Sequence, residues 1–385
     1  MEKNKIKKIT REIESSNINF LIGAGLSRPF LQVLKNIEKD LIEAENKGDK
    51  KKILELKREY FEGVMEGNLK ITEDIKDALK DETLKNYKDF YKALNRVLLK
   101  RENSLLTKQV NIFTTNIDVF SEKALEELNL DFNDGFNGRF RPIFNLGNFK
   151  KSYFKKSLHY EMTSEIPVFN LLKIHGSLTW KNEGEKITLD RDLETIKSII
   201  EVKTDDGKFS DEYEKLMIVN PTEKKFKDTT LNERYYSLLR IYSNELEKQN
   251  CILFVMGFSF ADRHIRELTT MVAGSNPTLK IYILKYSPEK LPGEVKTEEE
   301  LKLEEMESEA KNKNIEIIYP EHGKVNSFDA LVLNIFDQIG KNIGKENIPD
   351  YPVDDKSQTK TAESESIKET LGSSDNLTID DETPF

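Results

Sequence analysis

The stretch INFLIGAGLS at residues 18–27 joins an apolar run to a glycine-rich turn. The apolar part has the length of a buried β-strand, and the glycines after it are typical of a tight turn into a helix. At such a turn the backbone N–H groups of Gly23, Ala24 and Gly25 can approach a pyrophosphate, and Ser27 adds a hydroxyl donor. Taken alone, a simple strand-to-helix turn without a ligand explains these residues equally well.

Other apolar runs of strand length alternate with segments of helical periodicity. The predicted strands are residues 110–114, 168–174, 251–256, 279–284 and 315–318, with a short one at 216–219 that closes at Asn220-Pro221. Helices are expected over most of 181–209, at 233–248, from about 261 onwards and at 327–343. Strands that are apolar throughout and separated by helices indicate a parallel sheet covered on both faces. The sequence therefore predicts an α/β fold with a Rossmann-like sheet.

Four predicted strands end in polar or glycine-marked segments, at residues 23–27, 114–118, 175–177 and 257–262. Open parallel sheets bind their ligands at the carboxyl ends of the strands. Because these ends share one edge of the sheet, we expect the four segments to form a single active site.

The second of these strand ends places an amide and a carboxylate two residues apart, in Thr115-Asn116-Ile117-Asp118. A carboxylate there can hold ribose hydroxyls, and an amide can orient water or a ribose oxygen. Capping of the next helix by Asn116 or Asp118 is the alternative, and it is compatible with a functional role.

A histidine and hydroxyl groups mark the other two strand ends. His175 directly follows a buried strand, where a histidine can act as a general base near neutral pH. A packed structural histidine is the alternative. Gly257 and Ser259 offer further backbone and hydroxyl donors. Asp262 and His264 begin the next helix, where the helix dipole favours a carboxylate for structural reasons.

The net charge of −9 is unevenly distributed over the 385 residues. Residues 345–385 hold 4 Lys and 11 acidic residues, giving −7 and leaving about −2 for the rest. The body is therefore nearly neutral, and global charge favours neither the presence nor the absence of a nucleic-acid partner.

Cys251 is the single cysteine, so one chain cannot build a four-thiolate zinc site, and we expect no zinc or other metal. The charged N-terminus is not followed by the apolar segment of a signal peptide, and no apolar run approaches the length of a membrane span. These features predict a cytoplasmic protein without a membrane partner.

We expect one large domain at residues 1–344 and an acidic, disordered tail at 345–385. Within the domain, residues 31–108 read as an insertion of amphipathic helices, and residues 131–165 as a small subdomain rich in aromatic and basic residues.

The segment 139–156 is the best candidate for contact with nucleic acid. It carries six basic residues and no acidic one, with five aromatic residues interleaved (Arg139, Arg141, Lys150, Lys151, Lys155 and Lys156; Phe140, Phe144, Phe149, Tyr153 and Phe154). Bases stack on aromatic rings while cations meet phosphates. The favoured alternative is that the aromatic residues form the core of the small subdomain and the lysines are merely solvated.

Taken together, the strand-end motifs resemble the sirtuin family. GAGLS at 23–27, TNID at 115–118 and HGS at 175–177 occur in the same order as the GAGxS, TxNxD-type and HG motifs of sirtuins. The resemblance covers about residues 17–340, although 31–108 carries no motif. It is closer to the bacterial sirtuin-like proteins of antiphage defence, which have counterparts of NDGFNG at 133–138 and GFSFAD at 257–262.

The resemblance implies an NAD hydrolase that releases nicotinamide and ADP-ribose. In that family scheme Gly23, Ala24, Gly25 and Ser27 would hold the pyrophosphate and the adjoining ribose. Asn116 and Asp118, with Thr115 beside them, would contact the nicotinamide ribose, His175 would be the base, and Gly257 and Ser259 would support the adenosine side.

Two departures from protein-deacylating sirtuins argue against a deacetylase. The chain cannot form their four-cysteine zinc ribbon, and Arg28-Pro29-Phe30 is not followed by the rest of a GIPDFR-like stretch. Neither departure affects NAD cleavage with water as the acceptor.

The resemblance also implies a homo-oligomer and a HerA-like motor ATPase as partner, with NAD depletion as the defence. Two other functions remain open from the sequence. One is a non-catalytic module that senses NAD or ADP-ribose, and the other is a DNA-binding or nuclease subunit of a defence complex.

Overall fold

The computed structural model describes residues 3–33, 37–101, 106–159, 161–219, 229–290 and 295–343. All of them belong to one compact unit, Met1–Gly344. The expected acidic tail at 345–385 and the predicted strand end at Asn220-Pro221 lie outside the described residues.

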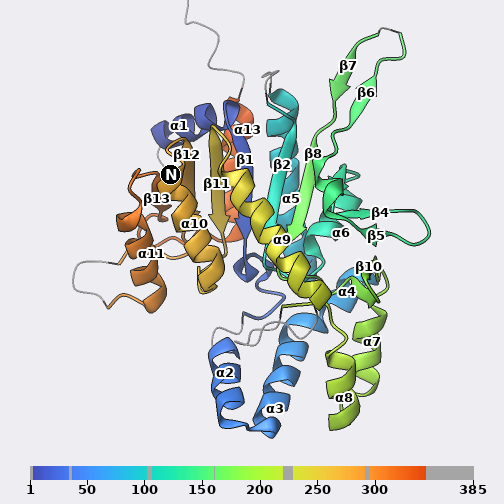
Figure 1. The fold of residues 1–385 in the computed structure, drawn as a ribbon. Helices are drawn as coiled ribbons and strands as arrows, with labels where there is room; N and C mark the ends of the chain where they lie inside the picture. The colour runs from blue at the N-terminus through green and yellow to red at the C-terminus, as the bar shows by residue number, and fades with distance from the viewer. Residues whose placement is uncertain are drawn as a thin grey trace, which may run out of the picture. The chain divides into compact units, whose positions relative to one another are not determined.

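Seven parallel strands form the central sheet, in the order β13-β12-β11-β1-β2-β8-β3 (Figure 1). They are β1 (Asn17–Ile22), β2 (Gln109–Thr114), β3 (Phe132–Asn133), β8 (Val168–Lys173), β11 (Cys251–Met256), β12 (Leu279–Leu284) and β13 (Ile315–Ile318). Six of the seven match apolar runs in the sequence, and the predicted Rossmann-like α/β fold is confirmed. The four polar strand ends belong to β11, β1, β2 and β8, which are consecutive in the sheet.

Helices cover both faces of the sheet, because the strand side chains alternate between two apolar cores. Phe20 and Ile112 face one core, built with α1 (Lys3–Glu14), α5 (Ala78–Lys100), α6 (Phe120–Glu127), α12 (Phe328–Leu331), the π-helix η4 (Val332–Phe336) and α13 (Asp337–Asn342). Leu21 and Phe113 face the other core, built with α9 (Thr229–Leu246), α10 (Arg263–Ser275) and α11 (Glu298–Glu309).

Three asparagines form a polar row across the sheet on the face covered by α9. Asn19, Asn111 and Asn170 are in register on β1, β2 and β8. Asn111 Nδ2 donates to Asn19 Oδ1 (2.9 Å) and to Glu245 Oε2 of α9 (3.0 Å). Asn170 Nδ2 donates to Asn111 Oδ1 (3.0 Å). A slip of one residue would turn a strand's asparagine into the opposite, apolar core, so the row fixes the register that aligns the strand ends.

Helices fill most of the long connection between β1 and β2. They are α2 (Ile37–Lys47), α3 (Lys50–Tyr60), the π-helix η2 (Phe61–Met65), α4 (Asn68–Thr72) and α5. α5 packs into the main core through residues such as Phe90, and η2 and α4 add Met65 and Ile71, whereas the buried residues of α2 and α3 form a small cluster of their own. The connection is therefore anchored to the sheet by α5, while α2 and α3 form a hairpin that extends below the sheet in Figure 1.

A small antiparallel sheet lies beside the main one, in the order β4-β5-β10-β9. Its strands are β4 (Phe136–Asn137), β5 (Ile143–Phe144), β10 (Lys186–Leu189) and β9 (Trp180–Glu183). The prediction that 181–209 is mostly helical is therefore wrong in its first part. A hairpin forms there because Gly184 adopts the left-handed conformation (φ 72°) and buried Trp180 and Ile187 pack against the main domain. Only α7 (Glu194–Glu201) and α8 (Asp206–Tyr213) are helices.

Two further local predictions differ from the structure. The segment 216–219 is not a sheet strand, because only an isolated bridge joins Ile218 to Gly176. The glycine turn after β1 leads into a short 3₁₀ helix, η1 (Ala24–Ser27), rather than an α-helix. The chain leaves this turn in an extended conformation at Arg28, just before Pro29, and this stops helical propagation.

Candidate active site

The glycine turn is shaped by a close approach to the end of β11. A Cβ atom on Gly23 would lie 2.5 Å from the Gly257 carbonyl oxygen, and one on Gly25 would lie 2.9 Å from the Gly257 Cα. Gly23 N donates to the Met256 carbonyl (3.0 Å) and Gly25 N to the Gly257 carbonyl (3.0 Å). The two glycines therefore join the ends of β1 and β11, and their N–H groups are already used within the protein.

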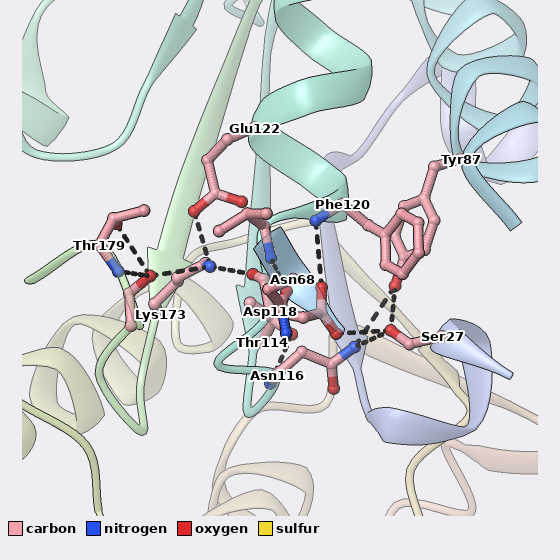
Figure 2. A network of polar contacts seen from close by, with 12 residues as sticks. Ser27, Asn68, Tyr87, Thr114, Asn116, Asp118, Phe120, Glu122, Lys173 and Thr179 are labelled. Atoms are coloured by element: carbon pink, nitrogen blue, oxygen red, sulfur yellow. Dashed lines mark hydrogen bonds and ion pairs between the residues drawn. The ribbon is translucent and has the colours of Figure 1, made fainter. Parts of the chain in front are cut away.

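Ser27, Tyr87, Asn116 and Asp118 form a buried network of hydrogen bonds between the ends of β1 and β2 (Figure 2). Ser27 Oγ donates to Asp118 Oδ2 over 2.6 Å. Asn116 Nδ2 lies 3.2 Å from Ser27 Oγ and 3.3 Å from the Tyr87 hydroxyl. The Tyr87 hydroxyl also lies 3.0 Å from Ser27 Oγ. Three residues from predicted strand ends and one from α5 thus share one network.

One atom of this network has no partner in the described structure: the carbonyl oxygen of Asn116, Oδ1. Asn116 is only 6% exposed, and its oxygen points away from Ser27 and Tyr87 in Figure 2. Asn116, Ser27 and Asp118 line a cavity of about 50 Å³, together with Ala24, Leu31, Gln32, Tyr60, Val64, Thr115 and Ile117. Because an unpaired buried carbonyl is costly, Asn116 Oδ1 marks a place for a polar ligand atom or a water.

Asp118 is a buried carboxyl group with two fixed roles. Its Oδ2 accepts from Ser27, and its Oδ1 accepts from the backbone N–H of Phe120 at the start of α6 (3.2 Å). Burial raises the pKa of Asp118 above its usual value, and the positive charge of Lys173 partly opposes this rise. The Asp118 side chain therefore both holds the start of α6 and lines the cavity.

Lys173, the last residue of β8, connects two of the strand ends. Its ammonium group donates to the backbone carbonyl of Asp118 and to Ser177 Oγ (3.1 Å), and it forms an ion pair with Glu122 Oε1 of α6 (2.6 Å). The Lys173 side chain is only 4% exposed, and burial raises the pKa of Glu122. This buried pair holds the end of β2 against the end of β8 (Figure 2).

His175 contacts the end of β11, across the two strands that lie between β8 and β11 in the sheet. Its Nε2 lies 3.1 Å from Asp262 Oδ2, and its ring is 19% exposed and packs beside Tyr235. Asp262 Oδ1 accepts from His264 N and Ile265 N, so the carboxylate is held at the start of α10. If Nε2 donates to Asp262, Nδ1 carries the free lone pair.

Direct contacts link all four strand ends into a closed ring. β11 joins β1 through Gly25 and Gly257, and β1 joins β2 through Ser27 and Asp118. β2 joins β8 through Leu178 N, which donates to the Ile117 carbonyl, and His175 and Asp262 close the ring. The structure therefore brings all the predicted segments to one edge of the sheet, although His175 does not line the cavity beside Asn116.

The remaining predicted residues lie at the same edge. Thr115 lines the cavity, and its N–H donates to the Ile22 carbonyl (3.2 Å). Gly257 adopts the left-handed conformation (φ 61°), with its carbonyl directed at the glycine turn. Ser259 is half-buried, and its hydroxyl accepts from Ala261 N over 3.4 Å.

Sequence reasoning did not assign Tyr87, Lys173 or Glu122 to the site. Tyr87 lies 60 residues from Ser27 and 29 residues from Asn116 along the chain, inside a helical stretch that carries no motif. Lys173 directly precedes Ile174 and His175 at the end of a mainly apolar strand, which is a usable signal, because a buried lysine requires a partner. The sequence favours a structural role for Asp262 at the start of a helix, and the structure adds its contact with His175.

The family model described as "SIR2-like domain" matches residues 110–318, more than half of the chain. The chain belongs to the SIR2-like domain family. The matched part of this SIR2-like domain begins in β2, so the glycine turn after β1 and Tyr87 of α5 lie outside it. It contains Asn116, Asp118, Lys173, His175 and Asp262.

Comparison with solved structures gives a match to a chain from work on the mechanism and regulation of Sir2 enzymes. The identity is 13%, the match covers 80% of this SIR2-like chain and 98% of that chain, and the TM-score is 0.32. No curated protein matches. Within the described ranges, no group of three or more His, Cys, Asp or Glu residues has the arrangement of a metal site. None of the described helices has the length and apolar character needed to cross a bilayer.

Proposed function

We propose that this protein is an NAD hydrolase. The bond between the nicotinamide nitrogen and the ribose carbon breaks, and its electron pair leaves with neutral nicotinamide. A water oxygen bonds to the same ribose carbon, and a proton of that water is released. The products are ADP-ribose and nicotinamide.

The observation that carries this proposal is the unpaired Asn116 Oδ1 in a cavity next to a buried carboxyl group. As nicotinamide leaves, positive charge grows on the ribose, and a nearby carboxylate stabilises it. The cavity beside Asn116 is lined by Asp118 and Ser27. An amide oxygen there accepts a hydrogen bond from the attacking water or from a ribose hydroxyl, which fixes the direction of attack. Membership of the SIR2-like domain family supports NAD as the substrate.

His175 is proposed to accept the proton. Its contact with Asp262 fixes the ring and leaves Nδ1 to act as the base. Gly23 and Gly25 are proposed to keep the ends of β1 and β11 together, which leaves Ala24 and Ser27 facing the cavity for ribose and pyrophosphate. Gly257 and Ser259 remain proposed contacts of the adenosine side.

The cavity is much smaller than a typical ligand pocket. Its volume of about 50 Å³ compares with roughly 300–1,000 Å³ for sites of organic ligands. Four of its lining residues come from the part of the β1–β2 connection that follows the glycine turn, namely Leu31, Gln32, Tyr60 and Val64. We propose that this wall moves outward when NAD binds.

We also propose that the protein acts in antiphage defence by depleting NAD, as a homo-oligomer bound to a HerA-like ATPase. The sequence resemblance supports this partner, and the α2–α3 hairpin offers an assembly surface. We propose that contact with this partner moves the cavity wall formed by Leu31, Gln32, Tyr60 and Val64.

The test is NAD consumption by purified protein, alone and with the candidate ATPase, with products identified by mass. We expect wild-type protein to form equal amounts of ADP-ribose and nicotinamide. His175→Ala and Asn116→Ala should each lower the rate by about 10²–10⁴-fold, because they remove the base and the orienting acceptor. His264→Ala and Asn137→Ala, which alter exposed residues of the same types, should keep full activity.

Two outcomes decide between the proposals, and one further measurement controls for the fold. Full turnover in both site variants would reject the site assignment. Tight NAD or ADP-ribose binding without turnover, under every partner condition, would favour the sensing module. Thermal unfolding at the wild-type midpoint would show that a loss of activity does not reflect loss of the fold.

The arm formed by β6 (Phe154–Lys156) and β7 (Thr163–Glu165) favours nucleic-acid binding as a second function. It projects from the body in Figure 1. Phe144 and Phe149 pack into the core, as the alternative interpretation of this segment requires. Phe140 and Phe154 do not pack into the core, because their side chains are 103% and 62% exposed. On the arm itself, the exposed ring of Phe154 directly precedes exposed Lys155 and Lys156, which suits a stacked base and its phosphates.

A Lys155→Ala, Lys156→Ala double variant tests this second function. If the arm binds single-stranded DNA, the variant should bind it more weakly and with a shallower dependence on salt, since about two phosphate contacts are lost. Lys51→Ala with Lys52→Ala, a pair of exposed lysines on α3, is the control. Equal affinity of both double variants for labelled DNA would remove nucleic acid as a ligand of the arm.

A further inference from the structure

Tyr87 reaches the proposed active site from α5, and its ring is held rigidly. The side chain is 1% exposed. Its ring stacks on Phe120 (centroids 5.4 Å apart, planes 3° apart) and meets Phe328 edge-on (5.0 Å, 85°). Phe120 follows the strand end that carries Asn116 and Asp118, so Tyr87 and the polar residues share one packed unit.

Counting protons fixes the direction of each hydrogen bond around Ser27. A serine hydroxyl has one proton and two lone pairs. Ser27 gives its proton to Asp118 Oδ2, so its lone pairs must accept from the two remaining neighbours, the Tyr87 hydroxyl and Asn116 Nδ2. Burial raises the pKa of Tyr87 well above its usual value, so the tyrosine keeps the proton that it donates.

These directions determine which end of the Asn116 amide faces the cavity. The NH₂ group can donate to both Ser27 Oγ and the Tyr87 oxygen. With the amide reversed, Oδ1 would face Ser27 Oγ, whose only proton is already given to Asp118, and the bond to Ser27 would be lost. The NH₂ group therefore stays at Ser27, and Oδ1 is left unpaired on the other side.

We propose that Tyr87 is a positioning residue that, with Ser27, holds the Asn116 carbonyl oxygen toward the cavity as the acceptor for the attacking water. This proposal rests on the proposed NAD hydrolysis. It assigns the long β1–β2 connection a direct part in building the site, because α5 supplies the group that orients a residue of β2's strand end. The tyrosine acts through Asn116 and needs no contact with the substrate.

The test compares Tyr87→Phe with Tyr91→Phe. Tyr91 lies one turn further along α5, is equally buried and packs its ring against Phe169. Tyr87→Phe removes only the hydroxyl, so we expect kcat for NAD cleavage to fall about fivefold to tenfold, the equivalent of one hydrogen bond. KM for NAD should stay within about twofold, since the loss concerns orientation for the reaction rather than binding. Tyr91→Phe should leave both constants unchanged.

Crystal structures of the two variants provide a readout that does not depend on turnover. We expect the Asn116 amide to be rotated or split between two orientations in Tyr87→Phe and unchanged in Tyr91→Phe. An unmoved amide in Tyr87→Phe, or equal kcat in the two variants, overturns the positioning role. Absence of NAD cleavage by wild-type protein rejects the proposed function instead, and the amide orientation is then judged from the structures alone.

Discussion

An Asp118→Asn variant should lose NAD cleavage by about 10²–10³-fold, the usual effect of removing one electrostatic contact to a transition state. The change removes the negative charge beside the cavity. It also reverses the hydrogen bond to Ser27, because an asparagine NH₂ at the Oδ2 position donates where the carboxylate accepted. The Ser27 hydroxyl proton, no longer donated to residue 118, would then be donated to another neighbour. The Asn116 amide would therefore lose its fixed orientation.

The same variant should be at least as stable as wild-type protein. Its advantage in unfolding free energy should be larger at neutral pH than at acidic pH. Burial raises the pKa of Asp118 in the folded state. A raised pKa means that the folded protein binds more protons than the unfolded chain, so the carboxyl lowers stability progressively as pH rises above its unfolded pKa of about 3.9. The advantage of Asp118→Asn over wild-type protein in unfolding free energy should therefore be larger at pH 7 than at pH 4.

Urea unfolding at the two pH values, beside the NAD assay, checks both parts. Asp131→Asn, the same change at an exposed position, is the control and should alter neither property. An active Asp118→Asn protein would contradict the proposed charge stabilisation. A variant less stable than wild-type protein at pH 7 would show that Asp118 acts mainly as a structural cap for α6.

A Lys173→Met variant should lose about 3–5 kcal/mol of unfolding free energy, the usual effect of leaving one half of a buried ion pair alone. The change strands the Glu122 carboxylate and removes the donor to the Asp118 carbonyl and Ser177 Oγ. The ends of β2 and β8 then lose one of the contacts that link them, so NAD cleavage should fall as well.

A double-mutant cycle with Glu122→Gln measures the pair directly. The Lys173→Met, Glu122→Gln double variant should regain much of the lost stability, because no unpaired charge remains buried. Lys85→Met is the control, since Lys85 is 70% exposed in its ion pair with Asp89 and should contribute at most about 1 kcal/mol. Additive losses in the cycle would show that Lys173 and Glu122 do not stabilise the protein as a pair.

Local pattern was sufficient to predict the sheet and its polar edge. Each strand of four residues or more in that sheet is rich in apolar residues, and parallel strands place their carboxyl ends at one edge whatever their order. The strand order could not be read from the sequence, yet β11, β1, β2 and β8 prove to be neighbours. For that reason Asn116 and Ser27, 89 residues apart in the chain, meet in one hydrogen bond.

The wrong or missed predictions concern segments whose structure depends on contacts with residues far away in the sequence rather than on local composition. Residues 180–189 are highly charged and suggested a helix, but β5 pairs with β10 and Trp180 lies in the core, which favours a hairpin. Tyr87 was overlooked for a related reason. Its position on α5 fits an apolar helix face, and nothing in the local sequence shows that its hydroxyl meets Ser27.

The most direct test of the account is a crystal structure of the Asn116→Ala variant soaked with NAD, because this variant should bind the dinucleotide without cleaving it. We predict that the nicotinamide ribose lies at the edge formed by β1, β2 and β8, between position 116 and the His175 ring, with the wall of Leu31 and Tyr60 displaced from its present place. NAD bound at another surface, or an empty edge at saturating NAD, would contradict the assignment of the polar ends of β11, β1, β2 and β8 to one active site.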